Sequence, residues 1–252
     1  MVRPHPATDA FPLIREVGLT GKLVTFADTF SEPANRAALA FRAAVEAQGW
    51  PEVAETATSL TSVFLRFDPL ALDHNVLEGR LKALISDSDW FAAPLPTGRT
   101  LWRIPTVIGG AHGPQFIDAA ETAGLTPEEA RLQIADARVR VLTIGFAPGQ
   151  PYMGQLPPAW DIPRMTQLNP QVPGSSLVVA IRQLIIFAGP APTGWRHIGQ
   201  TAFKCFRPSS EAPFALTPGD EVTFREITPE ELDHIIATDQ TGDGGATREA
   251  LP

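Results

Sequence analysis

The stretch TIGFAPGQPYMG, residues 143–154, says most about the fold of this chain, because an apolar run enters a loop of alternating glycine and proline. Residues 139–144 have the β-branched composition of a buried strand. The glycines and prolines that follow fix backbone angles that other residues adopt only at a cost. The loop also carries Tyr152, the single tyrosine of the chain. Such a loop indicates either a binding site or a plain turn between strands.

Composition indicates a globular protein. Of its 252 residues, 44% are hydrophobic, which is enough for the core of one large or two modest domains. No apolar run reaches the ~18–20 residues that span a bilayer, and residues 1–10, MVRPHPATDA, lack the blocks of a signal peptide. We therefore expect a cytoplasmic protein. The formal net charge of −8 disfavours nucleic acid and anionic membranes as partners.

The single cysteine, Cys205, agrees with a reducing compartment, because it has no partner for an internal disulfide. It lies in the alternating stretch AFKCF, residues 202–206, which favours a strand position over a catalytic nucleophile. His197, close to Trp195, is interpreted as a strand-surface residue, with a pocket-lining position as the alternative. The histidines do not show metal-ligand spacing, so no metal site is predicted: His5, His74, His112, His197 and His234.

The first part of the chain predicts a flexible tail over residues 1–12, a small α+β domain over 13–92 and a proline-rich linker over 93–98. Within the domain we expect a strand, a helix, a strand and a helix in succession, at residues 22–27, 33–49, 60–67 and 70–85.

The second part predicts a β-barrel or sandwich over residues 99–228, because short strands alternate with Pro/Gly turns. Helices are expected at 113–123 and after Thr126, where proline and acids form a helix start. Residues 229–252 are predicted to be a C-terminal tail that begins with a helix start and is disordered from 241 onward. The strand candidates are residues 99–106, 139–144, 177–181, 184–187, 201–206 and 221–227.

Several catalytic patterns are absent, among them GxxxxGK[ST], HExxH, CxxC and GxSxG. The chain instead carries an ordered series of turns: GFAPGQPYMG at 145–154, IPR at 162–164, VPGSS at 172–176, PTGW at 192–195, GQT at 199–201 and TPGD at 217–220. In order and spacing these resemble the carboxyltransferase-domain family, which includes the B-type subunit of 5-oxoprolinase, allophanate hydrolase subunit 1, the sporulation-kinase inhibitor KipI and part of urea carboxylase. The resemblance covers residues 103–227, and a weaker one ends at Phe67-Asp68-Pro69.

This resemblance implies an α+β N-terminal domain followed by a mainly-β cyclophilin-like barrel. It further implies a partner, a homologous barrel protein similar to the C-type subunit of 5-oxoprolinase or to allophanate hydrolase subunit 2, with the active site between the two barrels and a third subunit taking part. For the oxoprolinase it implies that ATP phosphorylates the lactam oxygen, so that the ring amide opens. No metal or covalent cofactor is implied for this chain.

Glycines and prolines match the family pattern better than charged residues do. Where the family has YGGEFGPDL, residues 108–116 read IGGAHGPQF, so two acids and a tyrosine are missing. Loss of one oxyanion or phosphate donor typically lowers the rate by about 10²–10³-fold. The loss of several charged groups therefore argues against the same reaction run in the same way. At the other departures, Ile134 stands where the family has a histidine and Gln150 where it has a phenylalanine. Two arginines of the family pattern, the second of PRxxTPR and that of GRTP, are replaced by Asn169 and Gln200. The QTG turn reads Gln183-Leu184-Ile185.

The candidate pocket combines the Gly/Pro loop with retained and altered polar positions. Arg164 is interpreted either as a bidentate partner of a carboxylate or phosphate or as half of an ion pair. Tyr152 is expected to orient a ligand or to anchor its loop, Trp195 to be core or pocket wall, and Asp220 to be a turn residue. The pocket residues are Phe146, Pro148, Gly149, Tyr152, Arg164, Asn169, Ser176, Gln183, Trp195, Gln200 and Thr201.

Several functions stay open. The chain is expected to be a subunit of an ATP-dependent amide-hydrolysing complex that resembles 5-oxoprolinase and converts pyroglutamate to glutamate. The alternatives are a non-catalytic binding or regulatory module, like the kinase inhibitor, and a carboxyltransferase subunit for a urea-like or allophanate-like substrate. A changed substrate is a further possibility, in which Gln115, Asn169 and Gln200 are neutral hydrogen-bond partners of an uncharged ligand.

Overall fold

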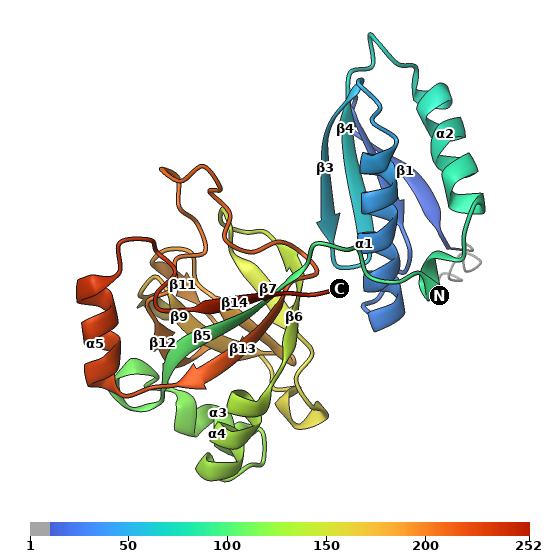
Figure 1. The fold of residues 1–252 in the computed structure, drawn as a ribbon. Helices are drawn as coiled ribbons and strands as arrows, with labels where there is room; N and C mark the ends of the chain where they lie inside the picture. The colour runs from blue at the N-terminus through green and yellow to red at the C-terminus, as the bar shows by residue number, and fades with distance from the viewer. Residues whose placement is uncertain (1–10) are drawn as a thin grey trace, which may run out of the picture. The chain divides into compact units, whose positions relative to one another are not determined.

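The computed structural model describes residues 11–252, so nearly all of the predicted tail at 1–12 lies outside the described residues. The chain divides into two compact units, of which the first ends at Pro96 and the second begins at Thr97 (Figure 1). The first unit is α+β and the second is a mainly-β barrel, which confirms the predicted fold class. None of the helices within residues 11–252 is long and apolar enough to cross a bilayer.

The first unit packs helices on an antiparallel sheet with the strand order β1-β2-β4-β3 (Figure 1). Its core joins the sheet to the helices through aromatic residues such as Phe26, Phe41 and Trp90, which meet edge to face. The elements are β1 Leu13–Val17, β2 Gly21–Thr25, α1 Glu32–Ala47, β3 Val53–Ser59, β4 Ser62–Phe67, α2 His74–Ser86 and the 3₁₀ turn η1 Trp90–Ala92.

Caps set the helix starts in this unit. The Ser31 side chain accepts a hydrogen bond from the Ala34 amide and begins α1, as the proline signal predicts. The second helix begins later than the predicted residue 70, because Asp68 closes a turn by accepting from the Leu70 amide and Asp73 then caps α2. The edge strands β1 and β3 were not predicted, since both are largely solvent-exposed and lack an alternating apolar pattern.

In the second unit, seven of the described strands close into a barrel. Their order is β12-β9-β10-β7-β6-β13-β5, and β5 also pairs with β12, which closes the ring. Apolar side chains from the strands and from α3 and α4 fill the core, among them Phe116, Ile134 and Phe224. The barrel strands are β5 Thr100–Ile108, β6 Val139–Ile144, β7 Pro151–Gly154, β9 Ser176–Ala180, β10 Gln183–Ile186, β12 Arg196–Thr201 and β13 Glu221–Glu226.

Shorter elements complete this unit. A two-stranded ribbon, β8 with β11, accompanies the barrel, and α4 begins at the predicted helix start, where Thr126 and Glu129 form a capping box. These elements are η2 Gly110–His112, α3 Phe116–Thr122, α4 Pro127–Asp136, η3 Pro158–Trp160, β8 Asn169–Val172, β11 Ala191–Thr193, α5 Pro229–Thr238 and β14 Thr247–Ala250.

Two predictions for this unit are wrong. The strand expected at 201–206 is instead β12, which ends at Thr201 because the Thr201 hydroxyl accepts from the Phe203 amide and turns the chain. The tail predicted at 229–252 is ordered structure. After α5, strand β14 pairs antiparallel with the first residues of β5, and backbone hydrogen bonding holds this exposed, polar strand in place.

Cys205 is buried behind the Gly/Pro loop rather than on a strand. Its side chain is 1% exposed, and its carbonyl lies against Gly149, where a Cβ atom would stand 2.7 Å from the carbonyl oxygen. Gly149 has a φ of +73°, so the close approach and the backbone angle both require glycine. Burial raises the pKa of the Cys205 thiol to about 12.

The Asp220 side chain fastens the barrel at the turn before β13. One carboxylate oxygen accepts from the Thr100 amide at 2.7 Å, and the other accepts from the Thr217 amide at 2.9 Å and its hydroxyl at 3.1 Å. Asp220 is 3% exposed, so these groups have no water to replace the carboxylate. The side chain therefore joins the start of β5 to the start of β13.

We expect Asp220→Asn to lower the free energy of unfolding by about 1–3 kcal/mol, because an amide nitrogen would face a buried N–H donor. Denaturant unfolding measures this change. Asp161→Asn is the matched control, since Asp161 is exposed and its change should stay within about 0.5 kcal/mol. Equal effects at the two positions would contradict the fastening role of Asp220.

We also expect the Cys205 thiol to be inert in the folded chain, because it is buried and is almost entirely protonated near pH 8. A thiol-reactive chromophore should label it only as denaturant unfolds the protein. The denatured chain, which should react at once, is the control. Complete labelling of the native protein within minutes would show that the site around Cys205 opens.

Candidate functional site

The Gly/Pro loop between β6 and β7 presents one aromatic side chain to solvent. Phe146 has a φ of +68°, rare for a residue with a side chain, and is 79% exposed. The base of the loop is closed, since the Gly145 amide donates to the Gln150 carbonyl and the Gln150 amide donates to the Ala147 carbonyl. The Gln150 side chain is buried and accepts weakly from the Ala188 amide. Pro148 is exposed and Gly149 is buried. The loop therefore has a closed, buried base from which Phe146 projects into solvent.

Tyr152 and Trp195 belong to an apolar cluster separate from the main barrel core. Tyr152 lies on β7, not in the loop, and its ring meets the Trp195 ring edge to face with centroids 6.1 Å apart. Trp195 is 6% exposed and packs with Val178 and Ile185. Trp195 is therefore a core residue here, and Tyr152 fastens β7 to that cluster.

An open cavity of about 520 Å³ lies where the segment after η3 crosses the start of α3 and the start of β12. It brings together two of the sequence-predicted residues, Arg164 and Asn169. Most of its wall comes from one irregular segment, residues 163–168. The lining residues are Gln115, Asp118, Pro163, Arg164, Met165, Thr166, Gln167, Leu168, Asn169, Pro170 and Arg196.

Two arginines line this cavity, and one of them is already hydrogen-bonded within the protein. The Arg196 guanidinium, from β12, pairs with Asp118 of α3 and donates to the Pro163 carbonyl at 2.7 Å and to the Thr122 hydroxyl at 3.2 Å. Arg164, by contrast, is exposed and has no hydrogen-bond or ion-pair partner among residues 11–252. The ion-pair interpretation of Arg164 is therefore wrong within the described chain.

Gln115 has no hydrogen-bonding capacity left. Its amide nitrogen donates to Asn169 Oδ1 at 2.8 Å and to Met165 Sδ at 3.5 Å, while its oxygen accepts from Asn169 Nδ2 at 2.8 Å and from the His197 amide at 2.7 Å. A glutamine side chain offers two donors and two acceptor lone pairs, so all four are filled. Gln115 stands at the acid of the family's GPDL and Asn169 at an arginine, so the two departures meet as a neutral pair.

Gln200 is also committed to the protein itself. Its amide nitrogen donates to the carbonyls of Gly174 and Thr201, at 2.9 and 3.1 Å, and its oxygen accepts from the Ser176 hydroxyl at 3.0 Å. The Asn169 amide nitrogen likewise donates to Gln115 Oε1 at 2.8 Å and to the Trp195 carbonyl at 3.5 Å, so the hypothesis that Gln115, Asn169 and Gln200 bind an uncharged ligand fails. Ser176, Gln183 and Thr201 are buried on β9, β10 and β12, so they do not line this cavity.

Two sequence interpretations near the cavity need correction. His197 is 6% exposed and not a strand-surface residue, and its Nε2 contacts the Gly199 carbonyl at 3.0 Å. Burial, together with the nearby charge of His112, lowers the pKa of His197, which keeps the ring neutral near pH 7. Asp118 and Arg196 carried no recognised signal, although Arg196 directly follows Trp195 in the PTGW turn. Among residues 11–252, no cluster of three metal-ligating side chains occurs.

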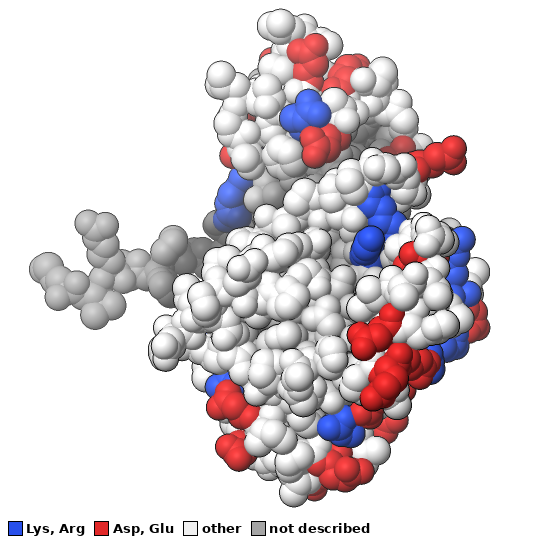
Figure 2. Space-filling model, turned by 90° about the vertical axis from the view of Figure 1, so that its left-hand side faces the viewer, with Lys and Arg blue, Asp and Glu red and all other residues white. Residues whose placement is uncertain are grey.

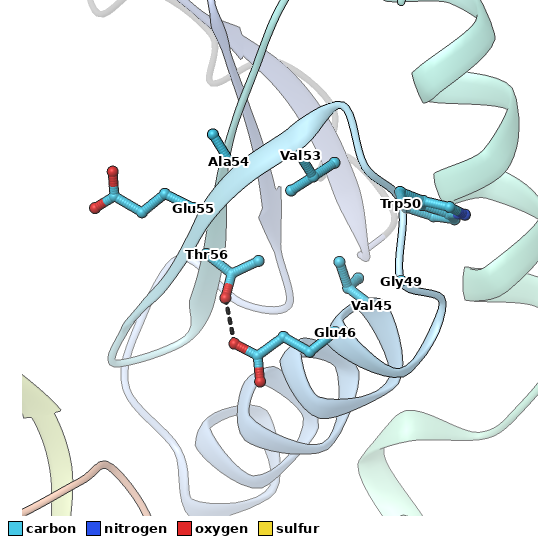
Figure 3. A pocket seen from close by; sticks show the side chains of 8 residues that line it. All are labelled: Val45, Glu46, Gly49, Trp50, Val53, Ala54, Glu55 and Thr56. Carbon is cyan, nitrogen blue, oxygen red and sulfur yellow. Dashed lines mark hydrogen bonds between the residues drawn. The ribbon is translucent and has the colours of Figure 1, made fainter.

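A second hollow, of about 260 Å³, lies in the first unit between the end of α1 and β3 (Figure 3). Figure 3 shows Thr56 directed at Glu46, whose carboxylate accepts from the Thr56 hydroxyl and also from Arg42. Val45, Val53 and Trp50 supply apolar wall. Because Glu55 is likewise paired, with Arg66, the polar side chains of this hollow are all engaged locally, and it offers a ligand less than the cavity around Arg164 does.

Comparison with known proteins identifies the relatives of this chain. The B-type subunit of 5-oxoprolinase from Bacillus subtilis is 27% identical over 229 residues, which cover 85% of this chain and 92% of that protein. The B-type subunit of 5-oxoprolinase from Haemophilus influenzae is 32% identical over 167 residues, which cover 66% of this chain and 73% of that protein.

Solved structures share the fold. The structure of TTHA0988 has a TM-score of 0.69 at 30% identity, over 86% of this chain and 40% of that one, so this chain spans less than half of its length. The K. lactis urea amidolyase has a TM-score of 0.74 at 17% identity, over 97% of this chain and 17% of that one, which shows the fold alone. Residues 12–216 match the family described as carboxyltransferase domain, subdomain C and D, in both units of the fold, and the chain belongs to that family.

Proposed function

We propose that this chain is the B-type component of a 5-oxoprolinase complex, in which ATP drives opening of the 5-oxoproline ring to glutamate. The single observation that carries this assignment is the free Arg164 guanidinium at an open cavity, in a chain whose relatives bear the name of that component. The substrate is a small carboxylate that also carries a lactam amide. Arg164 would hold the carboxylate through two parallel hydrogen bonds.

The cavity by itself lacks the groups that open an amide. Its one acid, Asp118, is paired with Arg196, and the two lining amides, Gln115 and Asn169, hydrogen-bond each other. Ring opening needs a proton donor to the leaving nitrogen and stabilisation of a developing oxyanion. In the proposed complex the homologous barrel subunit supplies these groups, together with the groups that bind the ATP phosphates. This chain then contributes one wall of the site.

The charge distribution supports a protein partner. Figure 2 shows, in the lower part of the view, a broad surface almost free of Lys, Arg, Asp and Glu, with charged side chains gathered toward its margins. Depletion of charge at the centre with charge at the rim is typical of protein–protein interfaces. The strongly exposed Phe146 is an aromatic side chain of the type enriched at such interfaces.

The proposal predicts a stable complex. Co-expressed with a homologous barrel subunit and a third subunit from its own genome, the chain should co-purify and support ATP-dependent conversion of 5-oxoproline to glutamate. The complex without this chain is the control. Absence of both complex and turnover would contradict the proposal. Recovery of a signalling protein instead would favour the regulatory module, and turnover of an allophanate-like substrate would favour the carboxyltransferase.

Arg164 provides the residue-level test. We expect Arg164→Ala to raise KM for 5-oxoproline by about 10–100-fold, because a charge-assisted hydrogen bond to the carboxylate is lost. Arg164→Lys should recover only part of the affinity, since an ammonium cannot bind a carboxylate bidentately. Steady-state kinetics of the complex measures both variants. An unchanged KM in Arg164→Ala would show that the carboxylate binds elsewhere.

A further inference from the structure

Arg164 belongs to a segment with no regular secondary structure of its own. Residues 163–168 follow η3 and precede β8, and Arg164, Thr166, Gln167 and Leu168 are all exposed. Such a segment holds a defined position only through its tethers to the barrel. The place of the Arg164 backbone beside the cavity therefore depends on these tethers.

Among the described residues, three hydrogen-bonding contacts tether the segment, and Asn169 after it also pairs with Thr193 of β11 and donates to the Trp195 carbonyl at 3.5 Å. The Met165 amide donates to the Gly194 carbonyl at 2.6 Å, and Arg196 donates to the Pro163 carbonyl at 2.7 Å. The third is Gln115, whose side chain binds both Met165 within the segment and Asn169, the first residue of β8, directly after it.

Gln115 is itself rigidly placed. Its backbone amide donates to the His197 carbonyl at 3.0 Å while its side-chain oxygen accepts from the His197 amide at 2.7 Å, so it is fixed to β12 from both ends. It directly precedes α3, which begins at Phe116. One glutamine thus connects β12, the start of α3, the segment carrying Arg164 and the start of β8.

We propose that Gln115 is a positioning residue, which acts through the reciprocal Gln115–Asn169 amide pair to hold residues 163–169 on the barrel and so keeps Arg164 beside the cavity. This role rests on the proposed function for the identity of the ligand, but the tether itself does not. Because neither amide ionises, the tether is independent of pH over the range in which a carboxylate–arginine pair would gain or lose its charge.

The first test is a double-mutant cycle in the co-purified complex, with 5-oxoproline and ATP. Gln115→Ala should raise KM by about tenfold while kcat changes much less, because the loss equals roughly one half-buried hydrogen-bond pair. The double variant Gln115→Ala with Arg164→Ala should be no worse than Arg164→Ala alone, since Gln115 acts through Arg164. Additive effects, or an unchanged KM in Gln115→Ala, would overturn the proposal.

The second test does not need activity. Amide hydrogen exchange of the isolated chain should be faster by about tenfold or more at residues 164–169 in Gln115→Ala, above all at the Met165 amide, which donates to the Gly194 carbonyl. Strands β9 and β10 should be unchanged, which separates loop release from general destabilisation. Gln167→Ala is the matched control, because Gln167 is exposed in the same segment and has no hydrogen-bond partner among the described residues.

A pH series adds a signature that a merely structural role would not produce. In Gln115→Glu, protection of residues 164–169 should fall as the new carboxyl ionises, because it then loses its single O–H donor, which in the protonated form can donate to Asn169 Oδ1. The wild-type chain should show no such step after correction for intrinsic exchange. Equal protection in Gln115→Ala and wild type would overturn the proposal. Altered protection in a chain that forms no active complex would overturn the proposed function and leave the positioning role standing.

Discussion

The reciprocal amide pair between Gln115 and Asn169 is the interaction on which the candidate site depends. Each side chain donates to the other at 2.8 Å, and Gln115 also binds both backbone groups of His197. An amide pair of this kind satisfies its polar groups internally, so it can lie half-buried without a desolvation cost left over. It joins parts of the barrel unit that are far apart in sequence, and the wall of the cavity is built on that junction.

The division between satisfied and free polar groups separates residues with structural roles from Arg164, the residue proposed to bind the ligand. Gln115, Gln200, Arg196 and Asp220 use their hydrogen bonds within the protein itself. Arg164, which lines the cavity, has no such bond among the described residues. A cation that lacks partners in the fold but lies at the cavity is free to bind a ligand. The changes from the family pattern thus remove charge from the supporting pair and keep it at the position that faces solvent.

Turn chemistry made much of the barrel predictable, because the Gly/Pro turns and the cap at Thr126 depend on local backbone angles. Strands β1, β3 and β14 escaped prediction, since these polar or exposed strands owe their form to backbone pairing with a neighbour. The candidate site was less predictable, because its contacts join residues remote in sequence, with Gln115 and Asn169 54 positions apart. Turn motifs pointed to Arg164 and Asn169, and the fold brings these two to one cavity.

A crystal structure of the co-purified complex with 5-oxoproline bound is the most direct measurement of the role assigned to this cavity. We predict the ligand carboxylate on the Arg164 guanidinium, the Gln115–Asn169 pair intact behind it, and the lactam facing groups of the partner barrel. A ligand hydrogen-bonded to the amides of Gln115, Asn169 or Gln200, with their internal pairing broken, would contradict this assignment. So would a ligand bound away from this cavity.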